Sequence, residues 1–403
     1  MNRNASLLAC LGIALAACDG AGVSEASSAP AAATDGPVAL AEGIPAAGAA
    51  NTPEDAKPFV VTEVAQFVEP WAMTFLPDGR ALVTEKKGAL KLLGTDGKIG
   101  NVSGVPVVDY GGQGGFGDVV LHRDFATNGW VYLTFVEAGE DGTRGAVLAR
   151  AKLALDAEGN GSLSALEVIW RQVPKFKGRG HFSHRVAFSP DGMMFVSSGE
   201  REEFDPAQDM TSNAGKIVRL NDDGSVPGDN PFSDKGGVAA QIWSLGHRNL
   251  LGLAFDAQGQ LWNIEMGPRG GDELNRVERG SNYGYPIVSN GNHYDGRDIP
   301  DHVTRLEFNA PEVTWNPVIS PAGLVIYNGA LFADWQGDAF IGGLSGKALV
   351  RVEFHGAGAR EAARYDMGQR IREVEQGTDG SLYLLEDEDE GSGGRLLKLT
   401  PAS

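Results

Sequence analysis

The chain has 403 residues, of which 42% are hydrophobic, so it can bury one large core or two smaller ones. Its formal net charge of −19, with only scattered cations, argues against binding to nucleic acid or to anionic membrane surfaces. We interpret the one short basic run, Lys86-Lys87, as a solvated turn. The 56 glycines follow no collagen-like period and favour an all-β protein with many tight turns.

Residues 1–18 are predicted to be a lipoprotein-type signal peptide. One early cation and a short apolar run lead to Leu15-Ala16-Ala17-Cys18, which fits a cleavage box with Cys18 as the lipidated residue. An ordinary secretory signal, cut near the same place, is the alternative. The apolar run is too short for a stable transmembrane helix. We therefore expect the periplasmic side of the cell envelope, with membrane attachment only through a lipid anchor.

Residues 19–56 are rich in Ala, Gly, Pro and Ser and show no apolar periodicity, so they are predicted to be a flexible linker. Of the two cysteines, Cys10 lies inside the signal peptide and Cys18 at its end. The predicted domain, residues 57–403, therefore holds no disulfide and no thiolate metal site.

One sequence phrase recurs along this domain: an apolar residue, a turn that ends in glycine, and a short apolar run. Phe75–Glu85 and Phe188–Glu200 are two clear copies. A glycine turn between apolar runs is a strong hairpin signal. The six copies have their turn glycines at Gly79, Gly129, Gly192, Gly259, Gly337 and Gly380. Repeats of this size predict an all-β, six-bladed β-propeller, with a stacked sandwich as the alternative. Loops from all blades of a propeller meet at one end of its channel.

Two loops in the first half of the domain carry candidate site residues. Gln113 is an amide within the glycine-rich stretch Gly111–Gly117, which is otherwise read as a flexible turn. His181 and His184 precede a predicted strand, and residues three apart in an extended segment point to opposite faces. At most one of them therefore faces a given pocket. A neutral histidine at a channel mouth suits a general base, whereas a surface or core histidine is the alternative.

The stretch Gly246–Val277 places Arg248 and Asn249 before a predicted strand and an acidic turn after it. Arg248 offers a fixed positive charge, and an ion pair between neighbouring units is its alternative reading. Carbonyl and carboxylate oxygens suit calcium, although the spacing is not that of an EF-hand loop. The turn offers such oxygens at Gly267, Pro268, Asp272 and Glu273.

The last two repeats add three cations: Lys347, Arg370 and Arg372. Arg370 and Arg372 are two residues apart, so on a strand they share a face and repel each other unless an anion lies between them. Beside Arg248 and Lys347 at one channel mouth, they would form a pocket for a polyanion such as a polycarboxylate. Exposed cations on an edge strand are the alternative.

Together and in this order, these segments resemble the glucose/sorbosone dehydrogenase family, the soluble aldose sugar dehydrogenases that depend on pyrroloquinoline quinone (PQQ). The resemblance runs from about residue 60 to residue 400. The phrases that carry it are GHRN…GLAF, E-x-GP-x-GGDE-x-N, NYGYP, GKIVRLNDDGSVPGDNPF and R-x-R-[DE]-V. It implies PQQ and Ca²⁺ as cofactors on a six-bladed propeller.

The resemblance also implies roles for individual residues. His181 matches the catalytic base, and Gln113 matches a glutamine that contacts cofactor and substrate. Arg248 and Asn249 match residues that hold the quinone oxygens and carboxylates. The remaining matches are Arg370 and Arg372 to the cofactor-binding pair, the carbonyls of Gly267 and Pro268 to the ligands of an active-site calcium, and Glu273 with the Tyr283 carbonyl to a second, structural calcium site.

Three positions depart from the family's pattern. Gly180 stands where the best-known glucose dehydrogenases have an aspartate, so the sequence leaves open what holds the imidazole of His181. Ser345 aligns with the family's cofactor-binding lysine, and Lys347, on the same strand face, is the expected substitute. His184 stands where the family usually has a small residue.

The expected reaction is oxidation of an aldose at its anomeric carbon to the lactone. His181 would take the hydroxyl proton, hydride would pass to PQQ, and Arg248 with calcium would stabilise the negative charge on the quinone. The expected partners are an aldose sugar and an electron acceptor that the sequence does not identify, and we expect a monomer. A calcium-dependent lactonase-type hydrolase and a non-catalytic sugar-binding propeller are the alternatives.

Overall fold

The structure is a computed structural model that describes residues 57–356, 358–387 and 393–402. The predictions for the signal peptide, for Cys18 and for the linker over residues 19–56 lie outside the described residues. None of the helices in the described part of the chain is long and apolar enough to cross a membrane.

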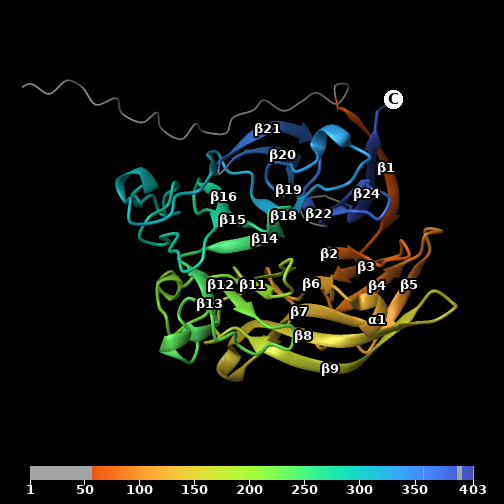
Figure 1. Cartoon of the computed structure of the whole chain (residues 1–403), viewed down its shortest axis with the longest axis horizontal. Helices are drawn as coiled ribbons and strands as arrows, with labels where there is room; N and C mark the ends of the chain where they lie inside the picture. The colour runs from red at the N-terminus through yellow and green to blue at the C-terminus, as the bar shows by residue number, and fades with distance from the viewer. Residues whose placement is uncertain (1–56, 357, 388–392, 403) are drawn as a thin grey trace, which may run out of the picture. The chain divides into compact units, whose positions relative to one another are not determined.

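The described residues form a nearly all-β architecture, built from antiparallel meanders of four strands (Figure 1). A short parallel pairing of β5 with β9 joins the first two meanders into one eight-stranded sheet. In chain order the strands are β2 (Pro70–Phe75), β3 (Ala81–Glu85), β4 (Ala89–Leu93), β5 (Ile99–Ser103); β6 (Phe116–Leu121), β7 (Trp130–Ala138), β8 (Arg144–Leu155), β9 (Gly161–Arg171); β10 (Ser183–Phe188), β11 (Met194–Ser198), β12 (Lys216–Leu220), β13 (Ile242–Leu245); β14 (Asn249–Phe255), β15 (Leu261–Met266), β16 (Asp272–Val277), β17 (Val313–Trp315); β18 (Pro321–Ile326), β19 (Ala339–Gly343), β20 (Ala348–His355), β21 (Gly358–Asp366); and β22 (Ile371–Gln376), β23 (Leu382–Glu386), β24 (Arg395–Pro401) with β1 (Phe59–Gln66).

Helices are short. The single α-helix of the described residues, α1, spans Phe125–Asn128, and short 3₁₀ segments lie in the longer loops. These segments are Glu140–Gly142, Asp205–Ala207, Ser233–Lys235, Ala239–Gln241, His302–Thr304 and Ala333–Trp335.

The predicted hairpins are confirmed. Each of the six turn glycines lies in the connection between the first and second strands of one meander. Each adopts a positive φ, for example +88° at Gly79 and +90° at Gly192, a conformation that glycine reaches without a steric penalty. The local turn chemistry read from the sequence therefore sets the repeating unit of the fold.

The first strands of the meanders pack against one another in a cycle. β2 packs on β6, β6 on β10, β10 on β14, β14 on β18, β18 on β22, and β22 returns to β2. The chain's first strand also completes the last sheet, because β1 pairs with β24 from Phe59↔Pro401 to Gln66↔Arg395 (Figure 1). The two ends of the described chain are thus joined within one sheet.

The apolar core lies between neighbouring sheets. Every residue of β3, β11, β19 and β23 is buried, because these middle strands are covered on both faces. One cluster links two sheets, with Trp262 and Ile264 from β15 packed near Leu324 and Ile341 from β18 and β19. Removing a side chain as large as Trp262 from such a cluster costs about 3–5 kcal/mol.

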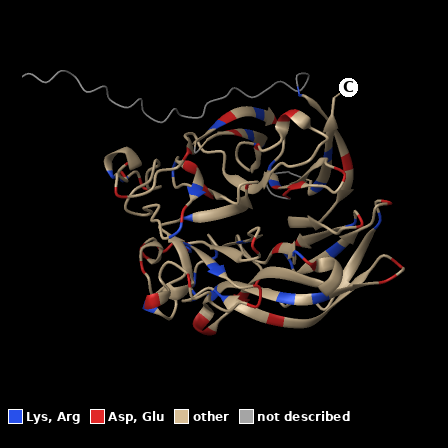
Figure 2. Ribbon diagram, viewed as in Figure 1, with Lys and Arg blue, Asp and Glu red and all other residues tan. Residues whose placement is uncertain are grey.

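Charged residues of both signs are interspersed over the sheets (Figure 2).

A buried ion cluster lies among the first strands of the meanders. Arg185 of β10 pairs with Asp118 of β6 at 3.5 Å and with Glu373 of β22. Its guanidinium also stacks on the Trp71 ring, with 4.1 Å from Cζ to the centroid. This cluster fixes the position of Trp71, which forms part of the site described next.

Candidate active site

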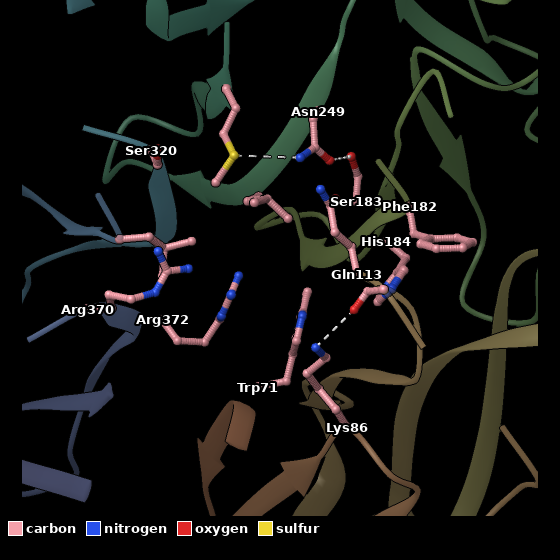
Figure 3. A pocket seen from close by; sticks show the side chains of 14 residues that line it. Trp71, Lys86, Gln113, Phe182, Ser183, His184, Asn249, Ser320, Arg370 and Arg372 are labelled. Carbon is pink, nitrogen blue, oxygen red and sulfur yellow. Dashed lines mark hydrogen bonds between the residues drawn. The ribbon is translucent and has the colours of Figure 1, made fainter. Parts of the chain in front are cut away.

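A cavity of about 270 Å³, here called the cationic cavity, opens where loops and strand ends from several sheets meet (Figure 3). It is assembled from distant parts of the sequence, as the channel-mouth argument predicts. Its lining consists of Trp71, Lys86, Gly112, Gln113, Phe182, Ser183, His184, Asn249, Leu251, Met266, Ser320, Leu344, Arg370 and Arg372.

Arg370 and Arg372 do share a face, and an anion does lie between them. That anion is internal: Asp387 accepts hydrogen bonds from Arg370 Nε at 3.0 Å and from Arg372 Nη2 at 3.0 Å. Burial lowers the pKa of Arg372, an effect that Asp387 opposes and Arg370 reinforces. Arg372 Nε, which Asp387 does not bind, is buried and has no hydrogen-bond partner among the described residues. One donor of the pair therefore remains for a ligand.

One wall of the cationic cavity is aromatic. The rings of Trp71 and His184 stack with centroids 5.0 Å apart. His184 is buried, and its Nδ1 lies 2.9 Å from Thr134 Oγ1. Burial, reinforced by the charge of Arg185, lowers the pKa of His184 to about 3, so the ring is neutral at physiological pH.

The cations gather differently from the prediction. Lys86 and Lys87 lie in a turn, as interpreted, but Lys86 also lines the cationic cavity and donates to the carbonyl of Gly112 at 3.2 Å. Lys347 lies in the turn between β19 and β20 with φ +47°, and Leu344 of the same turn lines the cavity instead. Arg248 lines an adjoining cavity.

This second cavity, of about 250 Å³, is here called the histidine cavity. His181 lines it while the next residue, Phe182, lines the cationic cavity; Arg248 and Asn249 divide in the same way. His181 and His184 thus face different cavities, as predicted. The lining is His181, Glu200, Glu202, Phe204, Arg248, Pro268, Tyr285, His293, Tyr294, Asp295 and Arg297.

Hydrogen bonds hold His181 at both its backbone and its ring. Its backbone N–H donates to Gln113 Oε1 at 2.8 Å, which connects the glutamine of the cationic cavity to the histidine. Its Nδ1 is hydrogen-bonded to the Glu200 carboxylate. Burial raises the pKa of Glu200, but the hydrogen bond and charge of His181 outweigh it and bring the pKa below its ordinary value. An ionised carboxylate only accepts, so Nδ1 carries a hydrogen, and in the neutral form of the ring Nε2 is the nitrogen with the lone pair.

Arg248 is buried, and its Nη1 donates to the carbonyls of Met266 at 3.0 Å and Gly267 at 2.6 Å. The rings of Tyr285 and Tyr294 flank its guanidinium at 5.9 and 5.7 Å. Its Nε is buried and has no hydrogen-bond partner among the residues described. Asn249, its neighbour, accepts from Ser183 Oγ at 3.1 Å and lines the cationic cavity.

Gly267 and Pro268 are predicted for one calcium site, and Glu273 and Tyr283 for a second. In the structure all four residues line a single small cavity of about 10 Å³, here called the carboxylate cavity. Gly267, Pro268, Glu273 and Tyr283 line it together with the buried Glu265. Burial, and then the charge of Glu265, raise the pKa of Glu273 well above its ordinary value. Two buried carboxylates in one place favour a proton or a cation between them.

The oxygens at the carboxylate cavity already have some partners. Gly267 O accepts from Arg248, and Tyr283 O lies 3.1 Å from His302 Nε2. Asp272 does not line the cavity; it accepts from the backbone N–H groups of Gly267 and Ser320 at 2.9 and 2.7 Å and closes the turn. The described residues contain no group of three or more His, Cys, Asp or Glu able to hold a metal. A cation here would therefore depend on backbone carbonyls.

The sequence did not single out Trp71, Glu200 or Glu202, and it did not indicate a site role for Lys86. Glu200 ends the repeated phrase FSPDGMMFVSSGE, which predicts only a hairpin, and Glu202 lies two residues beyond it. The signal that could have identified them is a carboxylate just beyond the strand that pairs with the histidine-bearing strand, since β10 and β11 are joined from Ser183↔Ser198.

Comparison with known proteins gives a consistent result. The family profile described as Glucose / Sorbosone dehydrogenase matches residues 67–398. Aldose sugar dehydrogenase YliI of Escherichia coli (strain K12) is 39% identical over 339 residues, which cover 82% of this chain and 90% of that protein. Quinoprotein glucose dehydrogenase B of Acinetobacter calcoaceticus is 28% identical over 311 residues, 71% of this chain and 63% of that protein.

Solved structures show the same relationship. The apo-form of the soluble aldose sugar dehydrogenase from Escherichia coli aligns with a TM-score of 0.80 and 37% identity over 85% of this chain and 100% of that chain. The PQQ-bound aldose sugar dehydrogenase from Streptomyces coelicolor aligns with a TM-score of 0.70 and 27% identity over 85% of this chain and 98% of that one. The fold is shared with these solved aldose sugar dehydrogenases. The chain belongs to the glucose/sorbosone dehydrogenase family, and the resemblance inferred from its motifs is confirmed.

Proposed function

We propose that this protein is a quinoprotein that oxidises aldose sugars at the anomeric carbon to lactones, with PQQ as its redox cofactor. The observation that carries this proposal is the adjacency of the two large cavities. One is lined by Arg370, Arg372 and Lys86 and would take a flat polyanion; the other presents His181, whose Nδ1 is hydrogen-bonded to Glu200 and whose Nε2 would act as the base.

The residues present fit PQQ, a planar tricarboxylate with adjacent quinone oxygens. Arg372 Nε and Arg248 Nε are buried donors without partners in the described part of the chain, and an anionic ligand would supply the missing acceptors. Lys86, Arg370 and Arg372 would balance the carboxylates. Gln113 and Asn249 add amides at the same cavity. Bound PQQ would supply the two-electron acceptor that none of the side chains provides.

The chain's own residues account for the proton. The sugar enters the histidine cavity, and Nε2 of His181 takes the proton of the anomeric hydroxyl while hydride leaves that carbon. Glu200 keeps the hydrogen on Nδ1 and balances the charge of the imidazolium that forms. Arg248, whose guanidinium is fixed by two carbonyls, stabilises the negative charge that develops on the acceptor. The rings of Tyr285, Tyr294 and Phe204 offer apolar surface to the sugar.

Calcium is the cation we propose for the carboxylate cavity. The donor set of carbonyls and carboxylates is of the hard-oxygen type that calcium prefers. Gly267, Pro268, Glu273 and Tyr283 would contribute to it, with Glu265 beside them. A cation would also relieve the repulsion between Glu265 and Glu273.

Three further expectations are part of the proposal. The six meanders are the blades of a six-bladed β-propeller, an arrangement supported by the cyclic packing of the first strands. The protein is a monomer held by a lipid on Cys18 at the periplasmic side of the cell envelope. The electron acceptor that reoxidises the cofactor is a separate partner.

Dye-linked oxidation of a panel of aldoses by the purified domain, with and without added PQQ and calcium, tests the proposal. We expect activity only when both are added. Activity without PQQ, or neither activity nor an absorbance change on PQQ titration, would contradict it. The second result would direct the next assay to lactone hydrolysis.

A further inference from the structure

We propose that Glu202 is a positioning residue for His181: its carboxylate, facing Nε2, stabilises the imidazolium that forms when Nε2 takes the substrate proton. The inference rests on the proposed function and extends it to a residue on a loop beside the base. It assigns a carboxylate to each ring nitrogen, Glu200 to Nδ1 and Glu202 to Nε2.

The first support is the geometry of the imidazole. Glu202 Oε1 lies 3.9 Å from His181 Nε2, and Glu200 is hydrogen-bonded to Nδ1 on the other side of the ring. Both carboxylates line the histidine cavity. Among the described residues, no hydrogen bond engages the Glu202 carboxylate. Its side chain is 51% exposed, whereas that of Glu200 is fully buried.

The second support is the backbone that aims Glu202. Arg201, Glu202 and Phe204 have φ of +67°, +63° and +61°, a backbone conformation that residues other than glycine rarely adopt. The segment is held there from both ends. Glu200 Oε2 accepts from the Phe204 N–H at 2.9 Å, so the residue that binds Nδ1 also fixes the loop that carries Glu202. Strained backbone of this kind concentrates at functional sites.

The third support is Arg201, which ties this loop to the segment that bears His181. Its buried guanidinium donates to the carbonyl of Gly180 at 2.8 Å and to that of Gly178. It also stacks on Phe182, with 3.7 Å from Cζ to the ring centroid. The residues on both sides of His181 are therefore fixed relative to Glu202.

The fourth support is Gly180. A β-carbon at this position would lie 2.4 Å from Cδ of Glu202 and 2.5 Å from each carboxylate oxygen. A side chain at 180 would therefore displace the Glu202 carboxylate, the flexible end of its side chain, from its present position. The absence of a side chain at Gly180 creates the space that Glu202 fills. An aspartate at 180, combined with removal of the Glu202 side chain, would return a carboxylate to that space from the other loop.

Two single variants test the charge at position 202. Glu202→Gln keeps the size of the side chain and removes its charge; Glu203→Gln makes the same change at the next, exposed residue, outside the cavity lining. We expect Glu202→Gln to lower kcat about tenfold, part of the 10²–10⁴-fold that a positioned base contributes. KM for the sugar, the Kd for PQQ from absorbance titration and the melting temperature should stay within about twofold or 2 °C of wild type. Glu203→Gln should match wild type in all four.

A pair of variants tests the exclusion between positions 180 and 202. We expect Gly180→Asp alone to lower kcat, because it displaces Glu202, and Gly180→Asp combined with Glu202→Ala to recover kcat above that of Glu202→Ala alone. A merely structural role for Glu202 gives no such recovery.

Three results would overturn the role of Glu202. The first is equal kcat for Glu202→Gln and Glu203→Gln, and the second is a raised KM in Glu202→Gln with kcat unchanged, which marks a sugar-binding carboxylate. The third is a kcat for Gly180→Asp combined with Glu202→Ala that does not exceed the kcat of Glu202→Ala alone. If wild type itself shows no PQQ-dependent aldose oxidation, the proposed function fails instead. If wild type is active and Glu202→Gln equals it, only this inference fails.

Discussion

Glu200 binds Nδ1 of His181 with one carboxylate oxygen and the backbone N–H of Phe204 with the other. The same side chain therefore sets the tautomer of the base and shapes the wall of the cavity in which the base acts.

The first prediction concerns the charge of Glu200. Glu200→Gln should lower kcat by at least tenfold, because the imidazolium loses its nearest counter-ion, while the Kd for PQQ changes little. Steady-state kinetics and absorbance titration measure the two effects; a parallel loss of PQQ binding would assign Glu200 to the cofactor instead.

His181 itself gives the second prediction. His181→Ala removes the base without touching the arginines of the cationic cavity, so PQQ binding should stay nearly intact and most turnover should disappear. Titration of the apoprotein with PQQ, followed by the aldose assay, checks both. His355→Ala, at an exposed histidine on β20, is the matched control and should behave as wild type. Equal loss of binding and turnover would argue against a base role.

Arg372 gives the third prediction. Its Nε is a buried donor that Asp387 does not satisfy, so Arg372→Met should raise the Kd for PQQ at least tenfold, the loss expected for one hydrogen bond to a charged group. Arg360→Met, at an exposed arginine of β21, is the control. An unchanged Kd in Arg372→Met would show that Asp387 and Arg372 form a structural pair only.

The difference between what the sequence predicts and what it misses follows from the range of the interactions. The hairpins at Gly79 and Gly192 depend on turn chemistry within a few residues, so a single sequence specifies them. His181 and His184 face different cavities, as their spacing predicts, but the backbone between them is left-handed at His181, Ser183 and His184 and not extended as the prediction assumes. By contrast, Asp387 reaches Arg370 because β22 pairs with β23, a register that the sequence does not display.

Lys86 and Lys347 illustrate the same limit. The sequence predicts Lys86 in a turn and Lys347 on a strand face, whereas both lie in turns, and only the assembled sheets bring Lys86 to the cationic cavity beside the Gly112 carbonyl. Glu202 is a further case, since its approach to His181 depends on left-handed backbone at Arg201 and Glu202 that no residue type in the segment announces. The motif-based resemblance points to the cations and to His181 as the base, whereas the approach of Lys86 and Glu202 to the cavities required coordinates.

The buried His184 gives the fourth prediction, on acid stability. Folded His184 binds its proton only near pH 3, because burial lowers its pKa, whereas the unfolded chain binds it near pH 6.5. Between these values the unfolded state holds more protons, so the free energy of unfolding falls as the pH is lowered through this window. One such group contributes up to about 1.4 kcal/mol per pH unit.

His184→Asn should remove that contribution. Urea unfolding of the apoprotein at pH 7 and pH 4.5 gives the slope for each protein, and the variant should lose less stability than wild type on acidification. His355→Asn, at the exposed histidine, should keep the wild-type slope. Identical slopes for wild type and His184→Asn would show that other groups, the buried carboxylates first, account for all of the acid sensitivity.

The fifth prediction concerns calcium at the carboxylate cavity. A cation that binds only the folded state raises its stability by about 2.7 kcal/mol at one hundred times Kd. Wild type should therefore melt several degrees higher in excess calcium than in a chelator. Glu273→Gln removes one of the two buried carboxyl groups, so most of this rise should vanish. Its melting temperature in chelator should stay equal to or above that of wild type, because burial and Glu265 disfavour the ionised form of Glu273, which the neutral amide avoids. Glu307→Gln, at an exposed carboxylate paired with Arg305, should retain the full rise. A calcium-dependent rise of equal size in Glu273→Gln would place the cation elsewhere in the protein.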